Sequence, residues 1–223
     1  MRAIAERVHA AGAWLCVDGV AFAPHRRVDV RALGADFWFA SAYKVFGPHV
    51  AFLWGRAELL ARARGQNCFF HGEDAVPAKL EPGGPIHELV ASLPGITEYL
   101  DWLGDGSLER AFAAIAEREA ELAAPLLAFL DAHPRVSLLG PATADPRERV
   151  PTIAFTVDGR RSSEIVSRLD EHGLALRYGH FYAYRPIRDL GLLDQDGVVR
   201  ASLLHYNTPA EVARLVEALD HVL

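Results

Sequence analysis

Three residues of this 223-residue chain have side chains and positions that could take part in catalysis. Asp18 ends the apolar run "AWLCVD", Lys44 follows "ADFWFASAY", and Arg200 lies in "VVRASLL" near the other end of the chain. Lysine is scarce, because Lys44 and Lys79 are the only two lysines among 23 basic residues and the others are arginines. A guanidinium stays protonated, whereas a desolvated lysine can act as a neutral nucleophile. We therefore interpret Lys44 as a residue that is kept for its chemistry.

A carboxylate and a lysine at one sheet edge would suit an aldehyde cofactor that carries a pyridine ring. The lysine can form a Schiff base with the aldehyde, and the carboxylate can keep the ring nitrogen protonated so that the ring accepts electrons. The apolar residues beside Lys44 are expected to desolvate it, which favours the neutral amine. Ser41 could donate to a phosphate, and the planar guanidinium of Arg200 matches the two oxygens of a substrate carboxylate.

Each of these residues also has an ordinary structural explanation. An aspartate before glycine at the end of a strand is often a turn residue. A single lysine on a loop is usually solvated, and an arginine in a C-terminal strand usually forms a salt bridge. From the residues alone, both the structural and the functional explanations stay open.

The elements that would position these residues belong to an α/β fold. The runs that end at Asp18 and Ser41, and the run "VAFLWGR", are typical of strands in a sheet that is covered on both faces. Ligands of such sheets bind beyond the carboxyl ends of the strands, so we expect Asp18 and Lys44 to face one crevice. Helices are expected over residues 2–10, 57–64 and 87–103, with a loop rich in glycine and proline before the last of them.

The sequence pattern changes after "GDGS", which predicts a domain boundary near residue 105. A helix capped by Ser107 is expected to run to about His133, and a closing helix begins after Thr208. A further helix over "RSSEIVSRLDEH" and short strands at "VSLLG", "TIAFTVD", "LALRYG" and "VVRASLL" complete the second half. We therefore predict a partial large domain over residues 1–105 and a small α+β domain over residues 106–223.

The composition argues against several classes of partner. With 51% hydrophobic and 23% charged residues the chain is typical of a globular protein. A net charge of −6 without a basic stripe disfavours nucleic acid and anionic membranes. No apolar run reaches the roughly 18–20 residues of a spanning helix, and no signal peptide is expected. Two cysteines make no disulfide framework, which predicts a cytoplasmic location, and no metal is expected because "HGED" lacks the spacing of a metal site.

Three stretches resemble one known family. "VDGVAFAPHRRVDVRALGADFWFASAYKVFGPHVAFLWGR" closely resembles the central segment of class V aminotransferases of the cysteine desulfurase-like group, which are fold-type I enzymes that use pyridoxal 5′-phosphate (PLP). "KLEPGGPIHELVASLPGITEYL" resembles the stretch that follows, and "VVRASLLHYNTPAEVARLVEAL" resembles the closing strand and helix of the family. The resemblance implies the C-terminal portion of a longer enzyme, with a mixed, mainly parallel large-domain sheet and a small α+β domain.

This resemblance implies a role for each residue of the predicted crevice. Lys44 would hold PLP as a Schiff base and carry the proton at the α-carbon of an amino-acid substrate. Asp18 would pair with the pyridine nitrogen, and Ser41 would contact the cofactor phosphate. His25 would support the site from behind the residues that touch the cofactor.

It also implies residues for the substrate and for a second subunit. Arg200 would hold the α-carboxylate of the substrate, and His180 and Tyr182 would shape the substrate pocket. Gly83 and Gly84 would face the cofactor phosphate of a partner subunit. The implied assembly is a homodimer with its active sites at the subunit interface.

The chain departs from the family pattern at the residue that matters most for sulfur chemistry. The string "GHFYA", residues 179–183, stands where desulfurases of the group carry a string like "GHHCA", so Tyr182 replaces the cysteine. A tyrosine cannot take sulfur from a substrate, which argues against sulfur transfer by the persulfide route. Ala21, Tyr43 and Gly84 also differ from the Gln or His, the His and the Thr of many relatives.

Family members extend further at the N-terminus, where a phosphate-binding loop at a helix N-terminus would lie. The chain is therefore expected to be a fragment or to be completed by the N-terminal half of a split gene. Two functions stay open. The first is a PLP-dependent transferase or lyase acting on an amino acid, with transamination, elimination and racemisation among its possible outcomes. The second is a non-catalytic, truncated fragment that contributes only a dimerisation and C-terminal domain.

Overall fold

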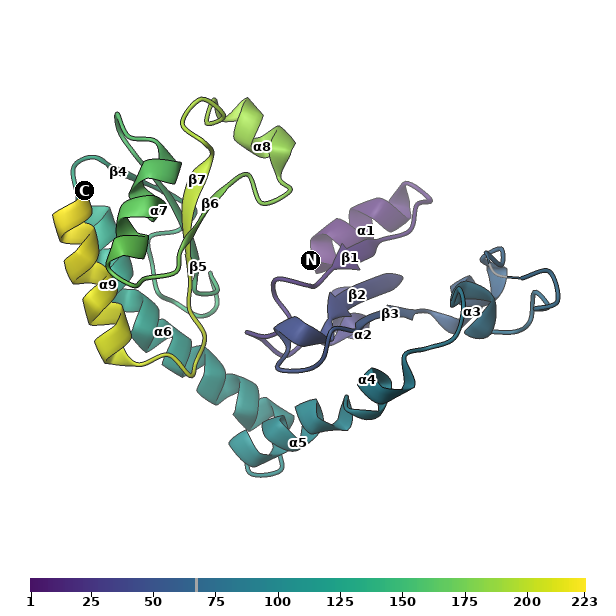
Figure 1. Ribbon diagram of the computed structural model, residues 1–223. Coiled ribbons are helices and arrows are strands. Elements are labelled where there is room, and N and C mark those ends of the chain that lie inside the picture. Colours follow the sequence, from purple (N-terminus) through teal and green to yellow (C-terminus); the bar gives the residue numbers. More distant parts are fainter. Residues whose placement is uncertain (67) are drawn as a thin grey trace. The chain divides into compact units, whose positions relative to one another are not determined.

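The computed structural model describes residues 1–66 and 68–223, and within them the chain divides into two units, Met1–Phe112 and Ala113–Leu223 (Figure 1). Each unit has its own sheet. The first sheet has the order β1-β2-β3, with β1 at Cys16–Asp18, β2 at Phe37–Ser41 and β3 at Ala51–Gly55. The second has the order β4-β5-β7-β6, with β4 at Val136–Leu139, β5 at Thr152–Val157, β6 at Arg177–Gly179 and β7 at Val198–Ser202.

The sheet of the first unit is mixed. Strands β1 and β2 run parallel, with Asp18 opposite Phe39, and β2 and β3 run antiparallel, with Ser41 opposite Ala51. Along β2 every second residue is buried, so Trp38 and Ala40 share the face that carries the small core of this unit. A two-residue repeat of this kind is the mark of a strand with one buried face.

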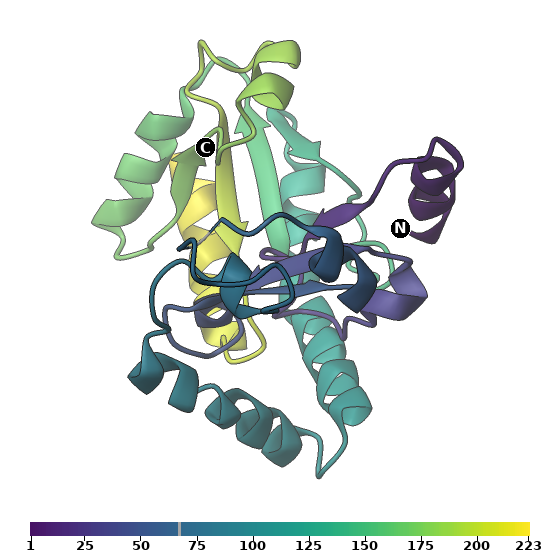
Figure 2. The ribbon, with the colours of Figure 1, turned by 90° about the vertical axis from the view of Figure 1, so that its right-hand side faces the viewer.

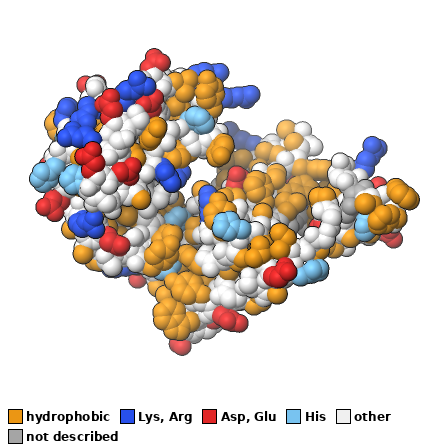
Figure 3. Space-filling model, in the orientation of Figure 1, with side chains coloured by type: hydrophobic (Ala, Val, Ile, Leu, Met, Phe, Trp, Pro, Cys, Tyr) orange, Lys and Arg blue, Asp and Glu red, His pale blue; other side chains and the backbone are white. Residues whose placement is uncertain are grey.

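The expectation of a sheet covered on both faces is wrong for the described part of the first unit. Strand β3 exposes Phe52 and Leu53, and hydrophobic side chains gather at the surface of this unit (Figure 3). The buried partners of Trp38 are Ala23, Ala40 and Val45, which come from the sheet and from the loops after β1 and β2.

The helices of the first unit follow the predicted pattern with two differences. Helix α1 (Arg2–Ala10) is confirmed, and α3 (Ala57–Arg62) is shorter than predicted. The single helix expected over residues 87–103 is two helices, α4 (His87–Ala91) and α5 (Pro94–Leu103). Proline has no backbone N–H and favours the first turn of a helix, so Pro94 ends one helix and begins the next.

One short helix of this unit, α2 (Val30–Leu33), was not expected, although its signals are local. The side chain of Asp29 accepts from the backbone N–H groups of Arg31 and Ala32, which is the contact an N-cap makes. Gly34 ends the helix in the left-handed conformation, with φ +72°. Two 3₁₀ turns, η1 (Ala42–Lys44) and η2 (Ala78–Leu80), complete the unit.

The second unit has a continuous core. Its sheet is wholly antiparallel, and helices α6 (Leu108–Ala132), α7 (Ser162–Glu171) and α9 (Pro209–Val222) lie on one side of it (Figures 1 and 2). The core joins fully buried residues of all three helices to β5 and β7, among them Leu130, Phe155, Ile165, Val199 and Leu219. Such close-packed apolar burial is the main source of stability in a domain of this size.

The predicted caps of the second half are confirmed. The Ser107 side chain accepts from Arg110 N at 3.3 Å, just before α6. Thr208 and Glu211 form a capping box at the start of α9. Helix α8 (Tyr184–Asp189) is an element that the sequence pattern did not predict. In the part of the chain that the structure describes, no helix is both long and apolar enough to cross a bilayer.

Candidate active site

The first unit brings three predicted site residues to one edge of its sheet. Asp18 and Ser41 are the last residues of β1 and β2, which run parallel, so their carboxyl ends lie at the same edge. Lys44 ends the 3₁₀ turn that follows β2 directly. Residues from distant parts of a chain meet at such edges in open α/β sheets, which is where these folds bind ligands.

The backbone around Asp18 is fixed by a close approach. Gly19 lies so near to Trp38 that a Cβ at this position would be 2.3 Å from the indole ring. Its N–H donates to Phe39 O at 2.8 Å, while Asp18 Oδ1 accepts from Val20 N at 2.9 Å. Glycine is therefore required after Asp18, and the carboxylate itself stays exposed at the sheet edge.

His25 lies in the turns that follow β1. The turns that follow β1 are closed by hydrogen bonds from Phe22 N and Ala23 N to Gly19 O and from His25 N to Phe22 O. The His25 side chain is buried. The turns after β1 therefore carry a buried imidazole seven residues after Asp18.

The loop that carries Lys44 is closed on itself. Ala42 O accepts from Val45 N at 2.8 Å and from Gly47 N at 2.9 Å, while Ala42 N donates to Val50 O at 2.7 Å. The ring of Tyr43 stacks on His49, with 5.0 Å between the ring centroids. These contacts hold the backbone on both sides of Lys44.

Helix α5 packs against the same loop from within the first unit. Phe46 adopts φ +63°, which is unusual for an aromatic residue, and its ring meets Tyr99 edge-on at 5.3 Å. A Cβ at Gly47 would lie 2.5 Å from Ile96 Cδ1, so glycine is needed for this approach. The segment after Lys44 is thus fixed by α5 as well as by its own hydrogen bonds.

The desolvation of Lys44 that its neighbours predicted is not found in the described residues. Lys44 is exposed, because Val45 points into the core and Phe46 packs against Tyr99. The other lysine is the buried one. The Nζ of Lys79 donates to Ala61 O at 2.9 Å and to Glu73 O, and its side chain has an exposed fraction of 0%.

Gly83 and Gly84 lie in an open segment of the first unit. Both residues are exposed, and a Cβ at either would meet nothing within 4 Å. Gly83 has φ +79°, a conformation that glycine adopts readily. Another molecule can therefore approach this backbone closely.

Arg200 lies in β7 of the second unit, opposite Ala154 of β5 and Arg177 of β6. Its guanidinium carbon lies 3.9 Å from the centroid of the Phe181 ring. Burial lowers the pKa of Arg200, since it disfavours the charged form. Its Nε is buried and has no hydrogen-bond partner among the described residues.

The segment 179–183 has an unusual backbone. Gly179, Phe181 and Tyr182 all have positive φ, at +126°, +49° and +65°, and Tyr182 is fully exposed at 101%. His180 Nδ1 accepts from Tyr182 N at 3.1 Å, and His180 O accepts from Ala183 N at 2.7 Å. Left-handed conformations cost non-glycine residues about 1–2 kcal/mol each, so the surrounding structure must hold this segment in place.

The turn before β7 supplies that support. A Cβ at Gly197 would lie 2.4 Å from the backbone of Gly179, so the two glycines are pressed together. The carboxylate of Asp196, the residue before Gly197, accepts hydrogen bonds from Arg161 Nε at 3.0 Å and Arg161 Nη2 at 2.9 Å. It also accepts one from the Ser163 hydroxyl. These hydrogen bonds lower the pKa of Asp196 to about 2, and the bond from Arg161 has the largest effect.

Sequence reasoning missed two residues of this region, Arg177 and Phe181. Arg177 stands opposite Arg200 only because β6 pairs with β7 in this register, and Phe181 reaches Arg200 only through the left-handed turn. The strings "RYG" and "VVR" predict strands, but they do not predict how the strands pair. The aromatic residues in and after the "GHFYA" string were the one sequence feature that pointed to this region.

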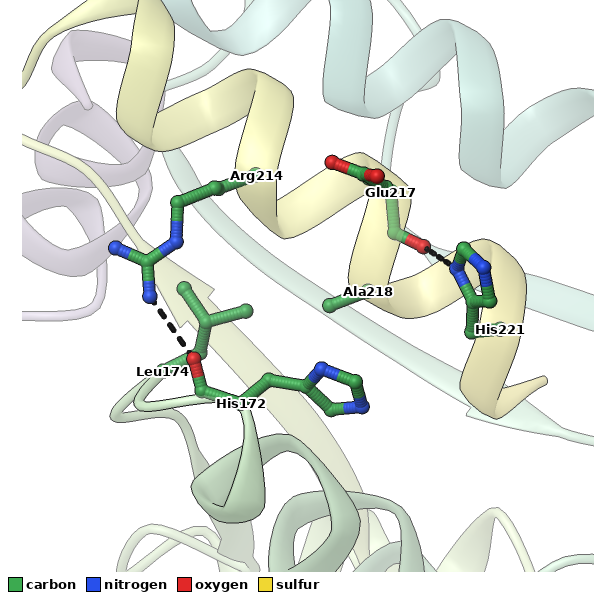
Figure 4. Close-up of a pocket in the computed structure, with 6 residues that line it drawn as sticks. All are labelled: His172, Leu174, Arg214, Glu217, Ala218 and His221. Atoms are coloured by element: carbon green, nitrogen blue, oxygen red, sulfur yellow. Dashed lines mark hydrogen bonds between the residues drawn. The ribbon is translucent and has the colours of Figure 1, made fainter.

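A separate hollow of about 320 Å³ lies between the C-terminal end of α7 and helix α9 (Figure 4). Arg214 Nη2 donates to His172 O at 2.9 Å, which satisfies a carbonyl at the end of α7. His221 Nδ1 lies 2.7 Å from Glu217 O one turn earlier in α9. The described residues that line this hollow include none of the predicted site residues. The two contacts show that it is a packing gap between the end of α7 and helix α9. No cluster of three or more metal-ligating side chains occurs within residues 1–66 and 68–223.

Comparison with known proteins decides the family. The model of the family described as aminotransferase class-V matches residues 1–215, nearly the whole chain. The chain belongs to the class V aminotransferase family. Members of this family are PLP-dependent enzymes, and the Asp18–Ser41–Lys44 edge lies within the matched segment.

Curated relatives of the family agree along the full chain. The aminotransferase-like protein FGM3 of Gibberella zeae is 40% identical over 225 residues, covering 100% of this chain and 55% of its own length. A probable cysteine desulfurase of Streptomyces coelicolor is 33% identical over 233 residues, covering 100% and 53%. The chain therefore spans about half the length of the curated relatives it matches.

Solved structures of the family share the fold. The crystal structure of the cysteine desulfurase CsdA from Escherichia coli is 30% identical with a TM-score of 0.74, covering 97% of this chain and 53% of that chain. The cysteine desulfurase of Thermococcus onnurineus NA1 has a TM-score of 0.82 at 23% identity, covering 97% and 54%, and so supports the fold alone. The predicted α/β class is thus confirmed, with a mixed sheet in the first unit.

Proposed function

We propose that this chain belongs to a PLP-dependent enzyme that acts on an amino acid, with Lys44 as the residue to which the cofactor is attached. The observation that carries the proposal is the placement of Asp18, Ser41 and Lys44 at one carboxyl edge of a family sheet. Their chemistry fits the cofactor, since they offer an amine, a carboxylate and a hydroxyl at the place where such folds bind ligands. The chain spans about half of its relatives, so the whole enzyme's activity is part of the proposal.

Each residue of this edge has one task. When bound, PLP supplies an aldehyde that condenses with amines and a ring that withdraws electrons. Lys44 Nζ binds it and moves the proton at the α-carbon of the substrate. Asp18 holds a proton at the ring nitrogen, since a carboxylate beside that nitrogen favours the charged form. Ser41 donates to the phosphate, and His25 supports the turn after β1 from the core side.

The second unit supplies the substrate contacts in this proposal. Arg200 binds the α-carboxylate with its planar donors. His180 and Tyr182 border the substrate, and the phenol of Tyr182 leaves no thiol for sulfur transfer at this position. We therefore propose a transfer or lyase reaction at the α-carbon rather than a persulfide route.

The assembly is also part of the proposal. Residues 1–105 form the cofactor-binding domain and residues 106–223 the small C-terminal domain. Gly83 and Gly84 offer open backbone to the phosphate of a partner subunit in a homodimer, or of a chain that supplies an N-terminal half. Cys16 and Cys68 are exposed and form no disulfide within the described residues, which fits the reducing cytoplasm that we propose as the location.

A second candidate function is a non-catalytic fragment that contributes dimerisation and a C-terminal domain. The observation that favours it is the exposed apolar surface of the first unit, where Leu53 is 56% and Trp102 73% exposed. Exposed patches of this kind mark association surfaces. Such a fragment would associate without binding PLP specifically.

Spectroscopy of the purified chain with PLP separates the two. We expect a visible absorption band that grows saturably with PLP, vanishes in Lys44→Ala and weakens or shifts in Asp18→Asn. Lys79→Met is a poor control because Lys79 is buried, so Arg62→Ala, an exposed cation of the same unit, serves instead and should leave the band unchanged. A band of equal strength in Lys44→Ala would contradict the proposal and favour the second function.

A further inference from the structure

Arg200 is held in a state that is unusual for an arginine. Within the described residues it makes no ion pair, and its buried Nε has no acceptor. Partly buried charges are normally paired, because desolvation without a partner is costly. A guanidinium in this state has donors that can pair with an anion from outside the chain.

The strands beside Arg200 offer it no negative charge. Ala154 of β5 stands opposite on one side and Arg177 of β6 on the other. Directly opposite residues of an antiparallel pair project from the same face, and like charges there repel each other. The nearest charged neighbour in the sheet thus raises the local positive potential instead of neutralising it.

Phe181 is the residue that contacts the guanidinium. Its ring centroid lies 3.9 Å from Arg200 Cζ, which is within the range of a cation–π contact. A ring over one planar face leaves the edge of the guanidinium, with its fork of N–H donors, available to a carboxylate.

The position of Phe181 is imposed by its surroundings. Phe181 and Tyr182 both adopt left-handed φ, and Gly179 before them is pressed against Gly197. The bond from Tyr182 N to His180 Nδ1 closes the turn. An aromatic residue does not choose this backbone by itself, so the fold places the ring over Arg200.

We propose that Phe181 is a positioning residue that orients Arg200 to receive the carboxylate of a monocarboxylate or α-amino acid. This inference rests on the proposed function, in which Arg200 binds the substrate carboxylate. Phe181 acts only through Arg200, by fixing the plane of its guanidinium, and needs no contact with the reacting atoms.

Side-chain NMR of the ¹⁵N-labelled chain tests the inference without the cofactor. The Nε–H signal of Arg200 is assigned by its loss in Arg200→Lys. We expect an upfield ring-current shift of this signal in the native chain. In Phe181→Leu the signal should remain, but the upfield shift should be absent. Propionate should move the signal saturably and propionamide should not. In Phe181→Leu the half-saturating propionate concentration should rise roughly threefold to thirtyfold, the range expected for loss of a cation–π contact.

Controls separate positioning from a general loss of structure. Phe181→Tyr keeps a ring and should retain both the shift and the affinity. Tyr178→Leu removes an exposed ring of the adjoining strand β6 and should leave propionate binding unchanged, with backbone amide spectra confirming that each variant is folded. Equal half-saturation in native and Phe181→Leu chains would overturn the inference. No response of native Arg200 to propionate would overturn the carboxylate role itself, while the absorption test of Lys44 would stand separately.

Discussion

The two units of this chain hold their functional residues in opposite ways. In the first, Asp18 and Lys44 lie exposed at the edge of a three-stranded sheet whose core is small and whose outer strand shows apolar side chains. In the second, Arg200 lies in a sheet that packs on a continuous core, and a turn with left-handed backbone holds Phe181 beside it. The larger core therefore lies in the second unit, whereas our proposal places the cofactor lysine in the first.

This difference teaches how each half fixes a side chain. The first unit combines local closure with packing against α5, since the loop around Lys44 bonds to itself, stacks Tyr43 on His49 and packs Phe46 on the helix. The second relies on tertiary packing, since Phe181 is placed by a glycine contact between β6 and the turn before β7.

The largest expected effect compares two leucines. Leu130 is 0% exposed in the core of the second unit and Leu53 is 56% exposed on β3. Leu130→Ala should lower the free energy of unfolding by about 2–5 kcal/mol, because it removes buried methyl groups and leaves a cavity. Leu53→Ala should change it by about 0.5 kcal/mol or less. Urea unfolding followed by circular dichroism measures both, and equal losses would break the comparison.

A smaller effect is expected where the two glycines meet. Gly197→Ala places a Cβ 2.4 Å from Gly179 at φ +74°, so it should cost about 1–3 kcal/mol of stability and disturb the turn that carries Phe181. Gly191 has φ +72° and open space around it. Gly191→Ala therefore measures the loss of stability that positive φ alone causes. The additional loss in Gly197→Ala measures the contact with Gly179. If both cost the same, the contact does not support the turn.

The smallest effect is a pH dependence in the second unit. Hydrogen bonds from Arg161 and Ser163 lower the pKa of Asp196 to about 2, from 3.8. A lowered carboxyl pKa contributes stability that is present above pH 3.8 and is lost as the pH falls through 2. The difference in thermal midpoint between the native chain and Asp196→Asn should thus be constant from pH 7 to 5 and shrink below pH 4. A difference that persists at pH 2 would show that the ion pair is not its source.

Much of the fold was accessible from sequence because its signals are local. Apolar runs that end in Asp18 and Ser41 gave the strands, and Ser107 and Thr208 gave the helix caps through side-chain contacts only a few residues away. Pro94 was a local signal as well, and neglecting it merged α4 and α5 into one predicted helix.

The geometry of the site could not be predicted in the same way. The sequence suggested that Lys44 is enclosed by its neighbours, but Val45 and Phe46 turn toward the core and α5 instead. Contact of Phe181 with Arg200 depends on strand register and on left-handed backbone, which no local pattern encodes. Family resemblance supplied roles for single residues but not the contacts that hold them.

The two lysines of the chain provide the most direct test of the central claim. Lys44 ends an exposed turn at the sheet edge, whereas Lys79 is buried with its Nζ bonded to Ala61 O and Glu73 O. The chain is incubated with PLP, reduced with borohydride, digested, and mapped by mass spectrometry. We predict a saturable adduct on Lys44 that falls strongly in Asp18→Ala and in Ser41→Ala, with Lys79 unmodified. An adduct absent from Lys44, or one whose yield is unchanged in Asp18→Ala and Ser41→Ala, would contradict the assignment of Lys44 as the cofactor lysine.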